Sequence, residues 1–151
     1  MATYQTIKEN SCANDHAALS ANMLEKRKVL LVEDNPLVQK VHRMMLQKVG
    51  CEVDTAADGK MALQLSENTY DLILMDIGLP GMNGLEVTSQ IRQREETTNA
   101  THTPIITLTA YSDEEARSNS LAAGSDEVLT KPIAFNDLCE LLQRWLAKSN
   151  C

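Results

Sequence analysis

Short apolar runs alternate with longer segments of helical periodicity from Lys28 onward. The continuous apolar run Val29–Val32 is typical of a strand buried on both faces of a parallel sheet. The same pattern predicts five strands, at 29–32, 51–56, 71–75, 104–109 and 127–130. The segments between and after them predict five helices, which begin at Pro36, at Asp58, after Gly84, at Ser112 and at Phe135.

Local signals mark the ends of several of these elements. Asn35–Pro36 combines an N-cap residue with a proline at the first helical position, and Gly50 ends that helix. The polar stretch Arg94–Thr103 is predicted to be a loop, with Glu95–Glu96 as a solvated charge pair. Five methionines are expected to pack in the core or at its rim: Met44, Met45, Met61, Met75 and Met82.

Five strands interleaved with five helices imply right-handed crossovers and a sheet covered by helices on both sides. The sequence therefore predicts an α/β doubly wound fold with a parallel sheet over residues 28–148. Residues 1–27 contain few large apolar side chains and are interpreted as a linker or N-terminal extension, in which 17–26 has the composition of a short helix. Residues 149–151 are interpreted as a tail.

Composition excludes several classes of protein. The 151 residues are 43% hydrophobic and 23% charged, which is typical of a globular domain. The net charge of −7 argues against general binding to nucleic acid or to an anionic membrane. No apolar run approaches the roughly 20 residues that span a bilayer, and Met1–Asn10 lacks the apolar core of a secretory signal. The four scattered cysteines predict reduced thiols in a cytoplasmic protein.

Polar residues that can carry chemistry follow four of the predicted strands. They are Glu33 and Asp34 after the first strand, Asp76 after the third, Thr109–Ala110 after the fourth and Lys131–Pro132 after the fifth. Because ligands of doubly wound sheets bind beyond the carboxyl ends of the strands, these residues are expected to converge at one edge. Grouped carboxylates repel one another unless a cation neutralises them, and an all-oxygen cluster suits Mg²⁺ (or Mn²⁺).

Each of these residues also has a purely structural explanation. An acid after a buried strand is often a helix N-cap, which explains Asp34 equally well when it is taken alone. A Lys–Pro pair is common in loops. The presence of all four groups at the predicted strand ends is what favours a functional site.

Five short segments carry a resemblance to a known family: Val29–Asn35, Asp71–Asp76, Pro80 with Gly84, Thr109–Ala110 and Lys131–Pro132. Together they make residues 28–146 similar to the receiver domain of two-component response regulators and hybrid histidine kinases. The resemblance implies a flavodoxin-like (βα)5 fold with the strand order 2-1-3-4-5.

The resemblance also implies a role for each residue of the strand-end cluster. Asp76 would be the phospho-acceptor, taking a phosphoryl group from a histidine kinase or a histidine phosphotransfer protein. Mg²⁺ would be held by Asp34, Asp76 and the backbone carbonyl of Gly78, with Glu33 acting directly or through water. The chain would then be a signalling domain that catalyses its own phosphorylation and its slow dephosphorylation.

The phosphoryl group would also change the conformation of the domain. Lys131 would hold one phosphoryl oxygen, while Thr109 would move toward another and draw its loop inward. In the family the readout surface is usually the region that corresponds here to 112–145. The family often places Tyr or Phe three residues before the lysine, and because Val128 stands there the aromatic part of the switch is expected to be absent.

Two residues beside the site are candidates for setting the lifetime of the phosphoryl group. Tyr111 lies two residues after Thr109, and a ring there would shield the phosphorus from water. Gly78 lies two residues after Asp76 and offers no side chain to orient that water. Slow self-hydrolysis is the resulting prediction, and the alternative is that Tyr111 merely covers the surface.

Other functions remain to be weighed against a receiver. A flavodoxin-like electron carrier shares the architecture, but the acids at Glu33–Asp34 would repel a flavin phosphate. A haloacid-dehalogenase-type phosphatase usually needs a second acid where Gly78 stands, and a cap domain for which the chain has no room. The third alternative is a non-phosphorylated pseudo-receiver that acts only as a docking module.

The biological context is less specified. The sequence favours the receiver of a hybrid histidine kinase, located in the cytoplasm and without direct contact to nucleic acid or membrane, over a stand-alone response regulator. The three histidines, His16, His42 and His102, are expected to lie outside the strand-end cluster. The cognate kinase, the signal and the oligomeric state are not encoded in any motif.

Overall fold

The computed structural model describes residues 26–146, so the predicted tail and all but the last residue of the predicted linker helix lie outside the described residues. The strands are β1 (Lys28–Val32), β2 (Glu52–Ala56), β3 (Leu72–Asp76), β4 (Ile105–Thr109) and β5 (Glu127–Thr130). The helices are α2 (Pro36–Lys48), α3 (Gly59–Leu65), α4 (Gly84–Thr98), α5 (Glu114–Ala123) and α6 (Phe135–Trp145). Each strand and helix predicted from Lys28 onward is therefore present, with most boundaries within two or three residues.

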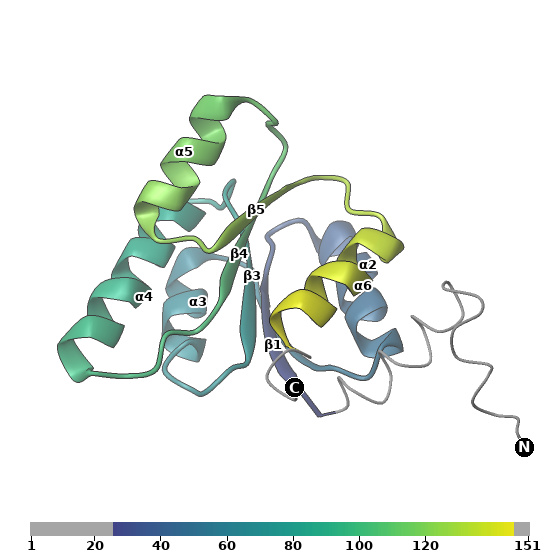
Figure 1. Cartoon of the computed structure of the whole chain (residues 1–151), viewed down its shortest axis with the longest axis horizontal. Helices are drawn as coiled ribbons and strands as arrows, with labels where there is room; N and C mark the ends of the chain where they lie inside the picture. The colour runs from purple at the N-terminus through teal and green to yellow at the C-terminus, as the bar shows by residue number, and fades with distance from the viewer. Residues whose placement is uncertain (1–25, 147–151) are drawn as a thin grey trace, which may run out of the picture.

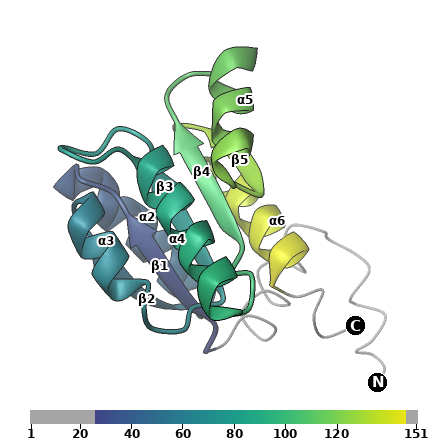
Figure 2. The same ribbon diagram turned by 90° about the vertical axis from the view of Figure 1, so that its left-hand side faces the viewer.

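The five strands form one parallel sheet in the order β2-β1-β3-β4-β5, as the resemblance implied. Helices α2 and α6 lie on one side of the sheet, and α3, α4 and α5 lie on the other (Figures 1 and 2). All strands run in the same direction, so their carboxyl ends meet at one edge, with Val32 beside Met75 and Thr109 beside Thr130. The order reverses between β1 and β3, and this is where ligands bind in such sheets.

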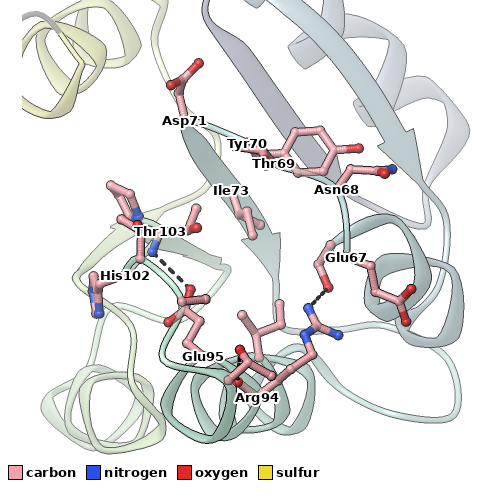
Figure 3. A pocket seen from close by; sticks show the side chains of 16 residues that line it. Glu67, Asn68, Thr69, Tyr70, Asp71, Ile73, Arg94, Glu95, His102 and Thr103 are labelled. Atoms are coloured by element: carbon pink, nitrogen blue, oxygen red, sulfur yellow. Dashed lines mark hydrogen bonds between the residues drawn. The ribbon is translucent and has the colours of Figure 1, made fainter.

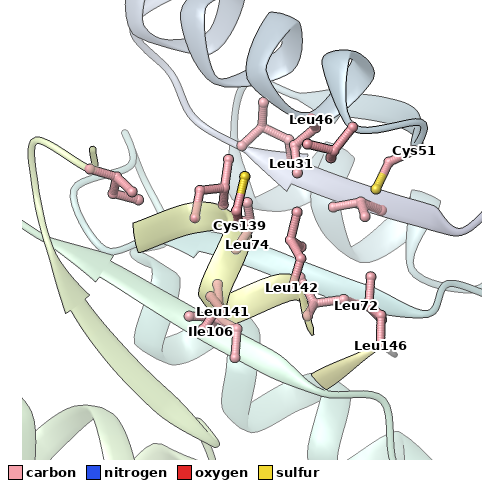
Figure 4. Packing of buried hydrophobic residues seen from close by; sticks show 14 of the residues in the cluster. Leu31, Leu46, Cys51, Leu72, Leu74, Ile106, Cys139, Leu141, Leu142 and Leu146 are labelled. Carbon is pink, nitrogen blue, oxygen red and sulfur yellow. The ribbon is translucent and has the colours of Figure 1, made fainter. Parts of the chain in front are cut away.

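Successive strand residues point to opposite faces, and each face has its own core. Leu31 and Leu74 pack with Leu46 of α2 and Leu142 of α6 on one face (Figure 4). On the other face, the residues of β1 and β3 pack with α3 and α4; this second cluster includes Leu30, Val32, Ile73, Met75, Ala62, Val87 and Ile91. Both faces of β1 and β3 are thus covered, which explains their uninterrupted apolar sequences.

The prediction of a loop over Arg94–Thr103 is wrong in its first half, because α4 continues to Thr98. Polar interactions replace apolar packing in this last turn and a half. Arg94 donates a 2.6 Å hydrogen bond to the hydroxyl of Ser66 beyond α3, and Asn99 ends the helix in the left-handed conformation. Glu95 is also not a solvated charge, because it pairs with Arg92 at 2.8 Å and accepts the backbone N–H of Thr103 at 3.0 Å.

The expectation for the methionines is only partly correct. Met75 is fully buried in β3, but Met44 is 56% exposed and Met61 is 44% exposed. Helix α2 packs on the sheet through a buried stripe formed by His42 and Leu46. A separate apolar stripe lies one residue away, on the surface of the helix. That surface stripe consists of Leu37, Val41 and Met44, and we call it the α2 apolar stripe.

Candidate functional site

The carboxylates that follow β1 and end β3 meet at the carboxyl edge of the sheet. One oxygen from each of Glu33, Asp34 and Asp76 lies within 4.8 Å of the other two. Glu33 and Asp76 are buried, at 1% and 4% exposed, whereas Asp34 is exposed. Two acids are therefore removed from water while the third faces it, which places the cluster at the floor and rim of a depression.

Lys131, on the loop after β5, supplies one positive charge that the two buried acids share. Its ammonium lies 3.1 Å from an oxygen of Glu33 and 3.1 Å from Oδ1 of Asp76. Burial opposes the charge on Lys131, but the hydrogen bonds and fields of Asp76 and Glu33 outweigh it and raise the pKa of Lys131. Burial and the charge of Asp76 raise the pKa of Glu33, against the effect of Lys131.

Backbone and side-chain donors hold the acids in place. The N–H of Asn35 donates to Glu33 Oε2 at 3.2 Å, and the Asn35 side chain caps α2 as predicted. The side-chain amide of Gln39 donates to the carbonyl of Glu33 at 2.9 Å. The N–H of Gly78 donates to Asp76 Oδ1 at 3.3 Å.

Gly84 allows α4 to begin directly against the backbone of Asp76. Its N–H donates to the carbonyl of Ile77 at 3.0 Å, and a Cβ at this position would lie only 2.1 Å from the carbonyl oxygen of Asp76. The glycine requirement here comes from a close approach of two backbone segments, not from an unusual φ.

Of the remaining predicted residues, Thr109, Ala110 and Tyr111 line the same site, whereas Val128 does not. Thr109 is buried, and its hydroxyl accepts the N–H of Tyr111 at 3.0 Å. Tyr111, which follows Ala110, is 68% exposed. Val128 lies half-buried in β5, paired with Thr107, so no aromatic side chain stands at that position. The depression has a volume of about 360 Å³ and includes Glu33, Asp34, Asp76, Gly78, Thr109, Ala110, Tyr111 and Lys131 in its lining.

The donor set of this site fits a hard divalent cation. Three carboxylates converge without any histidine or cysteine, and the two most buried ones already require a positive charge, which Lys131 provides. Mg²⁺ prefers oxygen ligands of this kind and binds through one or two carboxylates together with waters and phosphate. The chemistry of the ligands therefore matches the cation that the sequence predicted.

A larger cavity of about 590 Å³ lies at the other end of the strands, near the amino ends of β3 and β4 (Figure 3). Segments that precede β3 and β4 line it, together with the end of α4. Its inner charged side chains are engaged in the protein, since Arg94 bonds Ser66 and Glu95 bonds Arg92 and Thr103. The acidic depression, and not this cavity, holds the chemistry-bearing residues.

Sequence reasoning did not predict the contacts of three residues near the site. Gln39 and Gly84 contact the backbone of the acids, as described above, although Gly84 was already one of the residues that carried the family resemblance. His42, expected outside the cluster, is buried in α2, with its Nδ1 lacking a hydrogen-bond partner among residues 26–146. Burial and the field of Lys131 lower the pKa of His42, while Asp76 opposes that effect. The spacing of one helical turn between His42 and Leu46 was the sequence signal that could have predicted the burial of His42.

The sheet order and the acidic cluster at its switch point define a doubly wound α/β protein with a candidate cation site beyond the carboxyl ends of its strands. A family model for the response regulator receiver domain matches residues 29–143. The chain belongs to this family. The alternatives of a flavodoxin-like electron carrier and of a dehalogenase-type phosphatase are therefore not supported.

Individual relatives agree with this assignment. Hybrid signal transduction histidine kinase I of Dictyostelium discoideum is 35% identical over 148 residues, covering 94% of this chain and 8% of that kinase. The receiver domain of sensor histidine kinase PA1611 from Pseudomonas aeruginosa, solved with magnesium in its active-site cleft, is 41% identical with a TM-score of 0.72. That match covers 80% of this chain and 98% of that one.

A second solved structure contains a partner protein. It is the complex of the histidine phosphotransfer protein Ypd1 with the receiver domain of the response regulator Ssk1, from Saccharomyces cerevisiae. The match has 28% identity and a TM-score of 0.80, and covers 85% of this chain and 94% of that one. Within residues 26–146 no helix is long and apolar enough to cross a membrane.

Proposed function

We propose that this chain accepts a phosphoryl group on Asp76 in a Mg²⁺-dependent phosphorelay. The observation that carries the proposal is the arrangement of the Asp76 carboxylate. Its Oδ1 accepts hydrogen bonds from Lys131 and Gly78, whereas its Oδ2 has no hydrogen-bond donor within the part of the chain described. One oxygen is thus held by an ammonium and a backbone N–H, and the other is available as a nucleophile.

The acids would hold the cation from one side of the depression. Asp34, Asp76 and the carbonyl of Gly78 are the proposed ligands of Mg²⁺ (or Mn²⁺), with Glu33 acting directly or through water. When bound, the cation would neutralise the charge on the phosphoryl oxygens. Glu33 accepts hydrogen bonds from Lys131 and from the N–H of Asn35. These bonds favour a role for Glu33 as the charge partner of Lys131 over a role as a direct ligand of the cation.

The transfer itself requires positioning and little covalent machinery. Asp76 Oδ2 attacks the phosphorus of a phosphohistidine that is protonated on its other ring nitrogen. A P–O bond forms, the P–N bond breaks, and the imidazole leaves as a neutral group that keeps this proton. Lys131, already 3.1 Å from Oδ1, is placed to follow the new charge onto a phosphoryl oxygen. The hydroxyl of Thr109 now accepts a hydrogen bond from the N–H of Tyr111. It would give up this bond and donate one to another phosphoryl oxygen, which would move the loop that contains Ala110.

The surroundings support a long-lived phosphoryl group. Tyr111 stands over the depression with an exposed ring, and the position of Gly78 has no side chain to orient an attacking water. With Val128 in β5, the conformational signal would travel through the Thr109 loop without rotation of an aromatic side chain. The proposed readout surface is α5, β5 and α6.

Intact-mass spectrometry tests the phosphorylation directly. Incubation with acetyl phosphate and Mg²⁺ should add about 80 Da, the mass of one phosphoryl group. Asp76→Asn should abolish the adduct, and chelation of the cation should do the same. Asp58→Asn is the matched control, because Asp58 only caps α3 and asparagine caps helices equally well. An adduct that persists in Asp76→Asn refutes the proposal.

The α2 apolar stripe is the proposed docking surface for the phosphoryl donor. Leu37, Val41 and Met44 recur at i, i+4 and i+7, which is the spacing by which a helix packs against a partner helix. The stripe begins three residues after Asp34, so a bound partner would lie beside the acids. The solved Ypd1 complex supports a phosphotransfer protein as that partner.

A donor comparison isolates this docking step. Val41→Glu should slow transfer from a phosphorylated phosphotransfer protein but leave phosphorylation by acetyl phosphate unchanged. Met61→Glu is the control, since Met61 is similarly exposed but lies on α3, across the sheet from α2. Equal slowing with both donors would show a damaged site instead of a lost docking surface.

The parent protein is proposed to be a hybrid histidine kinase located in the cytoplasm or attached to its membrane. Residues 28–148 would form its receiver, 1–27 a linker and 149–151 a tail. A stand-alone response regulator and a pseudo-receiver are the alternatives. Phosphotransfer profiling against candidate kinases and phosphotransfer proteins distinguishes the first two, and the adduct experiment above excludes or supports the third.

A further inference from the structure

The carbonyl of Glu33 marks the point where β1 leaves the sheet. The N–H of Glu33 still bonds the carbonyl of Ala56 at 3.0 Å, as a ladder residue would. Its carbonyl is not held by a strand but by the side-chain amide of Gln39, at 2.9 Å from the second turn of α2. Buried backbone carbonyls need a hydrogen-bond donor. The side-chain amide of Gln39 supplies the donor that a neighbouring strand would otherwise provide.

This bond controls the direction of the chain at the next residue. The carbonyl of Glu33 and the N–H of Asp34 belong to one planar peptide unit, so fixing the first also fixes the second. The same turn is held from the other side by the N–H of Asn35, which donates to Glu33 Oε2 at 3.2 Å. Asp34 itself is exposed, so the orientation of its carboxylate depends on these contacts of its neighbours.

We propose that Gln39 is a positioning residue for the cation site: its amide fixes the Glu33–Asp34 peptide so that the Asp34 carboxylate stays aligned with Asp76. The inference rests on the proposed cation-dependent function. The inference adds Gln39 of α2 to the proposed cation site as a residue that does not touch the cation or the phosphoryl group. It also links the helix that carries the α2 apolar stripe to the acids.

The test compares two glutamine-to-methionine substitutions on the same helix. Gln39→Met keeps the length and helix preference of the side chain but removes the donor. Gln47→Met is the matched control, because Gln47 is exposed at the other end of α2. Mg²⁺ affinity is measured by calorimetric titration, and exchange of the Asn35 amide is measured by NMR in metal-free protein.

Gln39→Met should weaken Mg²⁺ binding by about fivefold, the equivalent of one hydrogen bond. It should also speed exchange of the Asn35 amide, whereas Gln47→Met should match wild type in both measurements. Saturating Mg²⁺ should restore the extent of Asp76 phosphorylation, which a generally damaged site would not allow. If Gln39→Met does not fold, Gln39→Asn, whose shorter amide cannot reach the carbonyl, carries the same comparison.

Two results overturn the inference in distinguishable ways. If wild-type protein binds Mg²⁺ and is phosphorylated on Asp76, but Gln39→Met has the same affinity as wild type, the positioning role is wrong and the proposed function stands. If wild-type protein binds no Mg²⁺ at all, the proposed function fails and the positioning role fails with it.

Discussion

Gly84→Ala should disturb the fold at the phospho-acceptor itself. The added Cβ would lie 2.1 Å from the carbonyl oxygen of Asp76, 2.9 Å from its carbonyl carbon and 3.0 Å from the Cα of Ile77. All three atoms belong to the backbone, so α4 and the end of β3 must separate by about 1 Å. Overpacking of this kind costs about 1–3 kcal/mol, while alanine gains at most about 1 kcal/mol in helix preference.

We therefore expect Gly84→Ala to lose about 1–2 kcal/mol of unfolding free energy, measured by urea denaturation in the presence of a chelator. Gly78→Ala provides the comparison within the same loop. A Cβ there meets nothing within 4 Å, and Gly78 does not have a positive φ. Its stability should equal or exceed that of wild type by about 0.5 kcal/mol, through the less flexible unfolded chain. The argument is refuted if Gly84→Ala stays within about 0.5 kcal/mol of wild type.

Three further predictions concern other parts of the domain. Tyr111→Ala should raise the rate of phosphoryl loss from Asp76 about threefold, about 0.7 kcal/mol of barrier, followed as decay of the mass adduct; an unchanged rate leaves Tyr111 as surface cover. Because the pKa of His42 is lowered in the folded protein, its contribution to stability is present above its ordinary pKa of 6.5 and is lost as pH falls through the lowered value. The free energy of unfolding from urea denaturation should therefore change less between pH 7.5 and pH 5 in His42→Leu than in wild type. Arg92→Met should cost about 3 kcal/mol in the same assay, because it leaves Asp126 and Glu95 without their guanidinium partner.

The sequence predicted the strands and the converging acids because both follow from strictly local patterns. A run such as Leu72–Met75 is apolar at every position, which only a strand covered on two sides requires. Once the strands are parallel, Asp34, Asp76 and Lys131 meet at one edge without any further information. The strand order and the individual roles came from the family resemblance.

What the sequence did not predict depends on contacts between distant residues. The last turn of α4 is polar and is held by Arg94 reaching Ser66, a contact that no local periodicity encodes. Helix α2 carries apolar residues on two adjoining stripes, so the pattern alone did not identify which stripe packs on the sheet. Gln39 was invisible for a related reason, since its partner is a backbone carbonyl that any sequence would provide.

The ammonium of Lys131 has a consequence for how the domain matures. Three carboxylates brought together would ordinarily make a nascent chain dependent on dissolved cations before it could become compact. Here an internal counter-ion, the ammonium of Lys131, already bridges Glu33 and Asp76, so these two acids can become buried without a dissolved cation. The proposed cation would then enter a site that is already assembled.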